Sequence, residues 1–197
     1  ASKSHRLMEN CMKKIAGCVF LCLCAVCFHT LAQASLITLA LEPSSVGAPP
    51  VGGVVTFELR ASGLADDLSL SVFDLNITYD PSVLSIASVI FGDPDLGDQL
   101  DPDNLADSIT SYISSNGVVN LYGLSMCSAA NLENSQEDSF ILATLGFTVV
   151  ALGYTDLDIA VNALGDSEAN SLSGYTKTVG AVVGPAVSGI ITILLEE

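Results

Sequence analysis

Few residues of this chain have the chemistry for catalysis, and most of those lie near its start. Both histidines, His5 and His29, and five of the six cysteines precede residue 35, and the sequence has no tryptophan. From residue 35 onward, Cys127 is the single thiol, and Arg60 and Lys177 are the only basic residues. These counts exclude Ser-His-Asp and Cys-His catalysis, imidazole metal sites and zinc clusters from this part of the chain. No Gly-rich phosphate loop follows a strand, so nucleotide binding has no support in the sequence.

Carboxylates are the abundant reactive groups. Of the 22 Asp and Glu residues, all but Glu9 follow residue 34. Two carboxylates across a cleft can hydrolyse a glycoside, but such pairs arise by chance among so many acids. We therefore predict no enzyme, no catalytic residue and no cofactor.

The densest acidic segment spans residues 92–107 and offers the oxygen ligands that calcium takes. Its spacing departs from an EF-hand loop, because Asp98 stands where glycine is needed and Asn104 where a closing Glu is needed. A solvated acidic loop is the simpler interpretation, with calcium as the alternative, and we assign no metal ligand. The carboxylates concerned are Asp93, Asp95, Asp98, Asp101 and Asp103.

The net charge of the chain is −16, and its positive charges cluster at the start. Lys3, Arg6, Lys13 and Lys14 all fall within the first fourteen residues, so the rest of the chain is strongly acidic. An acidic surface repels phosphate backbones and anionic membranes. We therefore expect no nucleic-acid partner.

Residues 1–34 have the layout of a leader with a secretory signal peptide. Met12-Lys13-Lys14 provides the positive charge, residues 15–28 form an apolar run, and Ala32-Gln33-Ala34 is a small-residue cleavage motif. The apolar run is shorter than the roughly 20 residues of a transmembrane helix, so we expect no membrane insertion after cleavage.

Residues 35–197 are predicted to form one domain. With Cys127 as its only thiol, that domain has no intramolecular disulfide, and we expect Cys127 to be a buried apolar filler.

Short alternating segments separated by Gly, Pro and Asn turns dominate the domain, and no helical period persists beyond one turn at residues 129–132. This pattern predicts an all-β fold, an antiparallel two-sheet β-sandwich. Asn116-Gly117 predicts a hairpin, because that pair readily adopts positive φ angles. Strands are expected at residues 36–41, 54–61, 68–80, 83–89, 109–113, 118–124, 140–152, 155–164, 179–183 and 187–195.

The clearest strand lies within residues 72–86. Phe73, Leu75, Ile77 and Tyr79 alternate with three polar residues, Asp74, Asn76 and Thr78. Successive side chains of a strand face opposite sides, so the first set is predicted to face the core and the second the solvent. The strand should end at Asp80-Pro81-Ser82, because proline cannot donate to the ladder.

This segment resembles the strand-turn-strand of cohesin domains, which ends in Tyr-Asp-Pro-x-x-Leu. The match here is Phe73-Asp74-Leu75-Asn76-Ile77-Thr78-Tyr79-Asp80-Pro81-Ser82-Val83-Leu84. Four other segments also resemble cohesins and occur in the same order along the chain, two before this match and two after it: residues 52–57, 62–64, 140–147 and 187–193. The resemblance implies a jelly-roll sandwich that binds another protein and does no chemistry. It also implies a partner contact at Asp74, with Val72 where cohesins carry a partner-contacting Asn. The domain is further similar to cohesin-like domains of secreted bacterial proteins with a PEP-CTERM sorting tail.

Two functions follow as expectations. The first is a secreted binding module at the surface of a bacterium, which attaches to a dockerin-like or surface protein through Asp74, Asn76 and Thr78. The second is a carbohydrate-binding module for polysaccharides. Without tryptophan, that module would stack sugars on Tyr112, Tyr122, Tyr154 or Tyr175.

Overall fold

The computed structural model describes residues 37–44, 49–64, 68–172, 174–179 and 181–183. The predicted leader and the strand predicted at residues 187–195 lie outside these ranges. No helix in the described part of the chain is long and apolar enough to cross a membrane.

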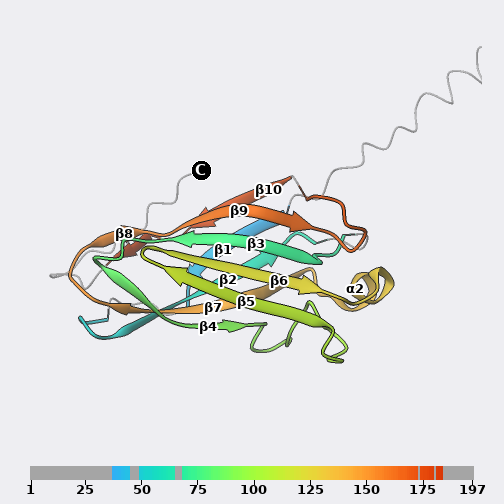
Figure 1. The fold of residues 1–197 in the computed structure, drawn as a ribbon, viewed down its shortest axis with the longest axis horizontal. Helices are drawn as coiled ribbons and strands as arrows, with labels where there is room; N and C mark the ends of the chain where they lie inside the picture. Colours follow the sequence, from blue (N-terminus) through green and yellow to red (C-terminus); the bar gives the residue numbers. More distant parts are fainter. Residues whose placement is uncertain (1–36, 45–48, 65–67, 173, 180, 184–197) are drawn as a thin grey trace, which may run out of the picture. The chain divides into compact units, whose positions relative to one another are not determined.

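Four antiparallel strands form the sheet that carries the predicted site. Their order is β5-β6-β3-β9, so β3 lies between β6 and β9. Figure 1 shows these strands lying over the strands of a second sheet. Their bounds are β3 Val72–Thr78, β5 Ser108–Ser115, β6 Val118–Ser125 and β9 Asp158–Gly165.

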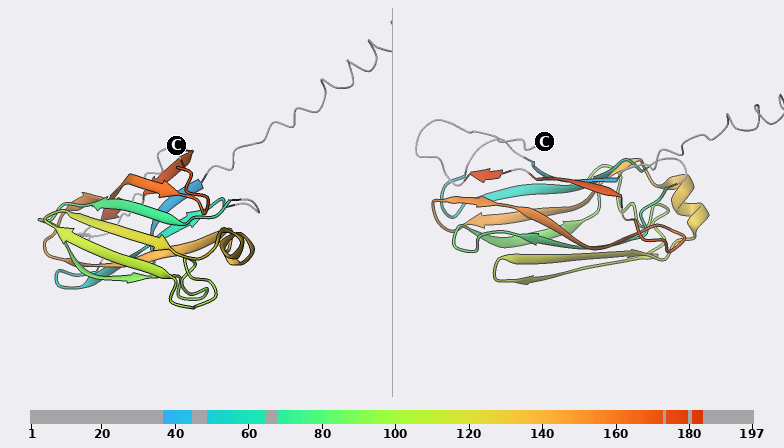
Figure 2. Two further views of the ribbon diagram at one scale, coloured as in Figure 1. Left: turned by 45° about the vertical axis from the view of Figure 1, so that its right-hand side comes forward. Right: turned by 90° about the horizontal axis from the view of Figure 1, so that it is seen from above.

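The second sheet has five strands in the order β10-β1-β2-β7-β4. Its pairs are antiparallel except β1 with β10, which run parallel. The bounds are β1 Ile37–Pro43, β2 Val54–Ser62, β4 Leu84–Phe91, β7 Ser139–Val149 and β10 Tyr175–Val179. The fold is therefore the predicted two-sheet β-sandwich with jelly-roll topology, and Figure 2 shows it from two further sides.

Three short elements complete the described chain. The strands β8 (Tyr154–Asp156) and β11 (Ala181–Val183) pair with each other, and the helix α2 (Ala129–Ser135) precedes β7. Residues 155–164, predicted as one strand, are divided between β8 and β9, which belong to different sheets. The predicted helical turn extends to seven residues, with the Ser128 side chain accepting from the Asn131 N–H as the N-cap.

The core lies between the two sheets and is built from alternate residues of their strands. Phe73, Leu75 and Ile77 of β3 are at most 1% exposed, which confirms the predicted inner face. Tyr79 is half-buried, and its ring lies 5.1 Å from that of Phe147 on β7, edge to face. This aromatic contact joins the end of β3 in one sheet to β7 in the other.

Candidate functional site

The predicted site residues lie on the outward face of the four-stranded sheet. Asp74, Asn76 and Thr78 are half-buried and alternate with the core residues of β3. On β6 they lie opposite Tyr122, Asn120 and Val118, respectively. The structure therefore places all three on one surface, as the alternation predicts.

Asp74 and Asn76 belong to a hydrogen-bonded network that spans three strands. Asp74 Oδ1 accepts from Asn120 Nδ2 at 2.6 Å and from Asn162 Nδ2 at 2.9 Å. Asn120 Nδ2 also donates to Asn76 Oδ1 at 2.9 Å, and Asn76 Nδ2 donates to Asn162 Oδ1 at 3.4 Å. Thr78 makes no hydrogen bond to this network in the described structure. The network fixes the Asp74 carboxylate in one orientation, with a negative charge presented on the sheet face.

The two asparagines that complete the network come from the flanking strands. Asn120 faces Asn76 directly in the ladder between β3 and β6. Asn162 lies at an irregularity of β9, where Leu75 pairs with Val161 and Asp74 with Ala163. Such an irregularity changes the direction of a side chain, and here the side chain concerned is that of Asn162. Both asparagines occupy outward positions in the sequence pattern, but only the strand register shows that they meet Asp74.

An apolar margin borders this polar network on the edge strand β5. Ile113, which is 72% exposed, lies opposite Asn120, and Ile109, which is 48% exposed, lies opposite Leu124. Leu124 in turn lies opposite Val72. A polar centre beside exposed apolar side chains is a suitable surface for another macromolecule.

The four tyrosines predicted for carbohydrate binding do not share one face. Tyr112 pairs with the buried Leu121, whereas Tyr122 pairs with Ser111, so the two rings leave the sheet on opposite sides. Tyr154 is 78% exposed on the short strand β8, and Tyr175 packs against the core. These four rings therefore form no common stacking platform.

The acidic segment 92–107 folds back on its own backbone. Asp93 and Asp101 are 8% and 6% exposed, so the interpretation of a solvated loop is wrong for these two residues. Asp93 accepts from the N–H groups of Asp95, Leu96 and Ile141, and Asp101 accepts from those of Leu105 and Ala106. These contacts make the two carboxylates internal caps of the loop.

Asp93 is held in its charged form. Burial by itself raises the pKa of the Asp93 carboxyl, but hydrogen bonds from Ile141, Asp95 and Leu96 and the charge of Arg60 outweigh it. The resulting pKa lies below its usual value. Ile141 belongs to β7, so the carboxylate attaches the loop to the five-stranded sheet.

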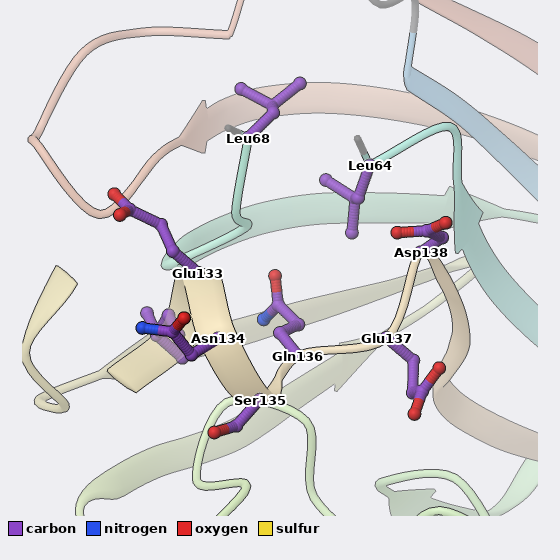
Figure 3. A pocket seen from close by; sticks show the side chains of 9 residues that line it. Leu64, Leu68, Glu133, Asn134, Ser135, Gln136, Glu137 and Asp138 are labelled. Atoms are coloured by element: carbon purple, nitrogen blue, oxygen red, sulfur yellow. The ribbon is translucent and has the colours of Figure 1, made fainter. Parts of the chain in front are cut away.

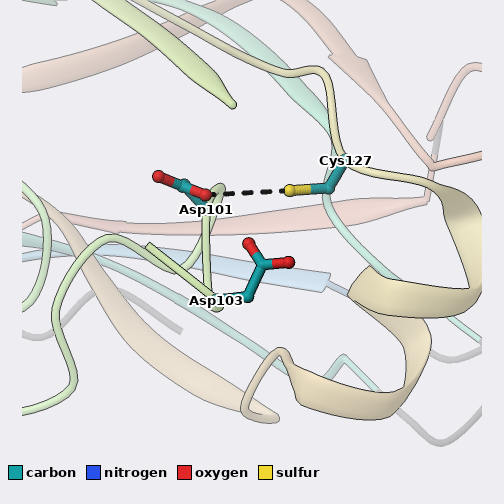
Figure 4. Close-up of side chains that lie close together, drawn as sticks. All are labelled: Asp101, Asp103 and Cys127. Atoms are coloured by element: carbon teal, nitrogen blue, oxygen red, sulfur yellow. Dashed lines mark hydrogen bonds between the residues drawn. The ribbon is translucent and has the colours of Figure 1, made fainter. Parts of the chain in front are cut away.

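Cys127 lies beside two carboxylates of the same segment, as Figure 4 shows. Its Sγ is 3.6 Å from the Leu100 carbonyl oxygen and 4.0 Å from Asp101 Oδ1. Burial raises the pKa of the Cys127 thiol, and the negative charges of Asp103, Asp101 and Asp107 raise it further. A hydrogen bond with Ser125 lowers this pKa but does not outweigh the other effects. The thiol is half-buried and is a weak nucleophile at neutral pH.

A polar hollow lies at the end of the sandwich around α2. Figure 3 shows Gln136 at its centre, with Leu64 and Leu68 above it. Gln136 is fully engaged, because its amide exchanges two hydrogen bonds with the backbone of Leu70 and donates a third to the Gln99 carbonyl. These bonds make the hollow a structural junction between α2, the segment before β3 and the acidic loop.

Several solved structures have this fold at low sequence identity. The seventh ScaB type I cohesin of Pseudobacteroides cellulosolvens is 18% identical with a TM-score of 0.58, and the match covers 80% of this chain and 97% of that one. The sixth cohesin of scaffoldin B from Acetivibrio cellulolyticus, solved in complex with a Cel5 dockerin mutant, is 19% identical with a TM-score of 0.56, covering 76% and 99%. A non-cellulosomal cohesin from the archaeon Archaeoglobus fulgidus is 17% identical with a TM-score of 0.53, covering 74% and 88%.

Sequence comparison agrees with the fold. No curated protein sequence matches the chain. A family model for the cohesin domain, however, matches residues 39–183, which is most of the chain. The match includes every strand of both large sheets except the first two residues of β1. The chain belongs to the cohesin domain family.

Proposed function

We propose that this chain is a secreted, non-catalytic cohesin module that binds a protein partner through the outward face of β5, β6, β3 and β9. The observation that carries this proposal is the Asp74 network beside the exposed Ile109 and Ile113. A fixed carboxylate gives a partner a directional acceptor, and the isoleucines give apolar area to bury.

A dockerin module is the partner class that the family suggests. Related cohesins of similar fold have been solved with dockerins bound. Val72 stands beside Asp74 on β3, so this face is more apolar at that point than a cohesin with asparagine there. We therefore expect a partner that places an apolar side chain against Val72 and Leu124 and a hydrogen-bond donor against Asp74.

The test measures binding to dockerin modules encoded in the same genome, by calorimetry on the full chain. We expect Asp74→Ala to weaken binding by about 1.5–3 kcal/mol, since a hydrogen bond to a charged group is lost. Ile113→Asp should weaken binding by a similar amount, because it places a charge in the apolar margin.

Glu42→Ala is the matched control, because Glu42 is exposed on β1 in the opposite sheet and should leave binding unchanged. Binding that survives both Asp74→Ala and Ile113→Asp would place the partner on another surface. Retention by soluble or insoluble polysaccharides, with no dockerin bound, would favour a carbohydrate-binding module instead.

Export belongs to the same proposal, because dockerin-mediated attachment takes place outside the cell. It is supported by the predicted signal peptide of residues 1–34 and by the acidic composition of the remainder. The similarity to PEP-CTERM proteins suggests a bacterial surface as the destination.

A further inference from the structure

A second polar cavity lies between α2, the segment before β3 and the loop after β9. Its lining side chains carry only hydroxyl or carboxylate groups and include no basic side chain or amide. They are Ser69, Glu133, Asp166, Ser167 and Glu168. Three of them are acids brought together from two separate parts of the chain. Oxygen atoms of carboxylates and hydroxyls are ligands that hard cations prefer.

Ser69 provides an independent sign of a ligand at this place. The residue is 2% exposed, and its Oγ is the one buried side-chain N or O atom without a hydrogen-bond partner among the described residues. A buried hydroxyl without a hydrogen-bond partner lowers the stability of the folded state by about 1–3 kcal/mol, unless a water or a bound ligand contacts it. The comparable buried hydroxyl of Ser125 donates to the Leu100 carbonyl, so the orphan state of Ser69 is specific to this cavity.

The carboxylates of the cavity have no positive countercharge. The two basic residues in the described ranges are paired elsewhere, Arg60 with Glu58 and Lys177 with Asp158. Instead, Asp166 Oδ1 accepts the backbone N–H groups of Glu168 and Asn170, and the Asn170 amide nitrogen donates to Asp166 Oδ2 at 2.9 Å and to Glu168 Oε2 at 3.4 Å. A rotation of this amide would place its oxygen beside the same two carboxylates, where it would be a further oxygen ligand for a cation.

In the acidic segment 92–107, Asp101, Asp103 and Cys127 lie closer together. Asp101 accepts two backbone N–H groups, as Asp166 does, so the bonding of the carboxylates does not distinguish the two places. No buried side-chain atom there lacks a hydrogen-bond partner. The loop therefore gives no sign of a ligand beyond its acids.

From these observations we propose that the cavity of Ser69, Glu133, Asp166 and Glu168 binds a calcium ion. Calcium accepts six to eight oxygen ligands in irregular geometry, which suits carboxylates from a helix and a loop. The ion would connect α2 with the loop after β9 and with the segment that leads into β3. This site is separate from the partner-binding face, so neither proposal depends on the other.

The experiment compares the thermal unfolding of the full chain in calcium chloride and in EGTA. A calcium concentration 100-fold above the dissociation constant should raise the melting temperature by about 5–10 °C. Magnesium should raise it less, since it requires near-octahedral geometry. An unchanged melting temperature in excess calcium would overturn the proposal.

Variants then locate the ion. Glu133→Gln and Glu168→Gln should each lose most of the calcium-dependent rise. Glu137→Gln should keep it, because Glu137 is exposed and lines the hollow around Gln136 but not the proposed cavity. If both cavity variants keep the rise and Asp101→Asn loses it, the ion binds in the acidic segment and the assignment is wrong.

Ser69→Ala separates the ligand role of the hydroxyl from a structural role. In EGTA this variant should be as stable as the wild type or more so, because a buried unpaired hydroxyl is removed. Its calcium-dependent rise should nevertheless be reduced. A variant that is less stable in EGTA and responds normally to calcium would show that the hydroxyl has a structural partner and does not bind the ion.

Discussion

At the scale of single residues, the carboxylates of this protein have different tasks that composition does not separate. Asp74 faces outward within an asparagine network, whereas Asp93 is buried and caps a loop. Asp80 is exposed at the end of β3, where hydrogen bonds from the Ser82 hydroxyl and N–H lower its pKa. One residue type thus serves a candidate binding surface, a loop anchor and a turn.

Asp93 supports a prediction about acid stability. Asp93→Asn should reduce the free energy of unfolding at pH 7 by about 1.5–3 kcal/mol, because three N–H groups lose a charged acceptor. The pKa of Asp93 is lowered in the folded state, so its contribution is complete above the unfolded pKa of about 4. The contribution is lost as the pH falls through the folded pKa.

Urea denaturation of wild type and Asp93→Asn at a series of pH values measures this effect. The difference between the two proteins should shrink below about pH 4. Asp95→Asn is the control, because Asp95 is exposed and donates only its backbone N–H to the loop. A difference that is independent of pH would contradict a charged role for Asp93.

At the scale of elements, the β5–β6 hairpin and the turn after β3 support each other. The Tyr79 N–H donates to the Gly117 carbonyl at 2.9 Å. A Cβ at Gly117 would lie 2.9 Å from the Tyr79 carbonyl oxygen and 3.2 Å from Pro81 Cδ. The predicted hairpin is confirmed, but of the Asn-Gly pair only Gly117 has a positive φ, at 81°.

Substitutions at Gly117 and Asn116 test whether only Gly117 requires a positive φ. Gly117→Ala should lower the free energy of unfolding by about 1–3 kcal/mol, since alanine is strained at positive φ and its Cβ meets the Tyr79 carbonyl. Asn116→Ala should change it by less than about 0.5 kcal/mol, because Asn116 is exposed with ordinary φ. Urea unfolding measures both. An equal loss of unfolding free energy in the two variants would mean that both positions require a positive φ.

At the scale of the whole molecule, the two sheets separate the tasks of core and surface. Phe147 of β7 contacts Phe57 in its own sheet and Tyr79 at the end of β3, so it holds the sheets together. The opposite face of β3 remains available to a partner. The strong negative charge of the domain is expected to repel acidic partners.

The organisation of the whole chain gives a prediction about export. Expression of residues 1–197 in a bacterial host should release a mature protein that starts at Ser35, because Ala32-Gln33-Ala34 has the small residues of a cleavage site. N-terminal sequencing or intact mass of the exported protein measures this. A replacement of Ala34 by a bulky residue, Ala34→Leu, should block processing. Retention of residues 1–34 in the exported wild type would contradict the signal-peptide assignment.

The sequence alone determined the local features of this protein. Strict alternation assigned Phe73, Leu75 and Ile77 to the core and Asp74 and Asn76 to the surface, because side-chain direction along a strand depends only on neighbours in the chain. The Tyr-Asp-Pro turn and the order of the other strands were enough to indicate the family. The lack of histidine and paired cysteine after residue 34 left carboxylates as the abundant reactive groups.

The tertiary structure decided what depends on residues distant in the chain. Asn120 and Asn162 reach Asp74 only through the registers of β6 and β9, and an irregularity in β9 shifts the pairing that simple alternation predicts. Asp93 is buried because it accepts from Ile141, 48 residues away. Ser69 meets Glu133 and Asp166 only where α2 and the loop after β9 come together. Strand register and loop packing are set by interactions across the whole fold, so no local pattern encodes these contacts.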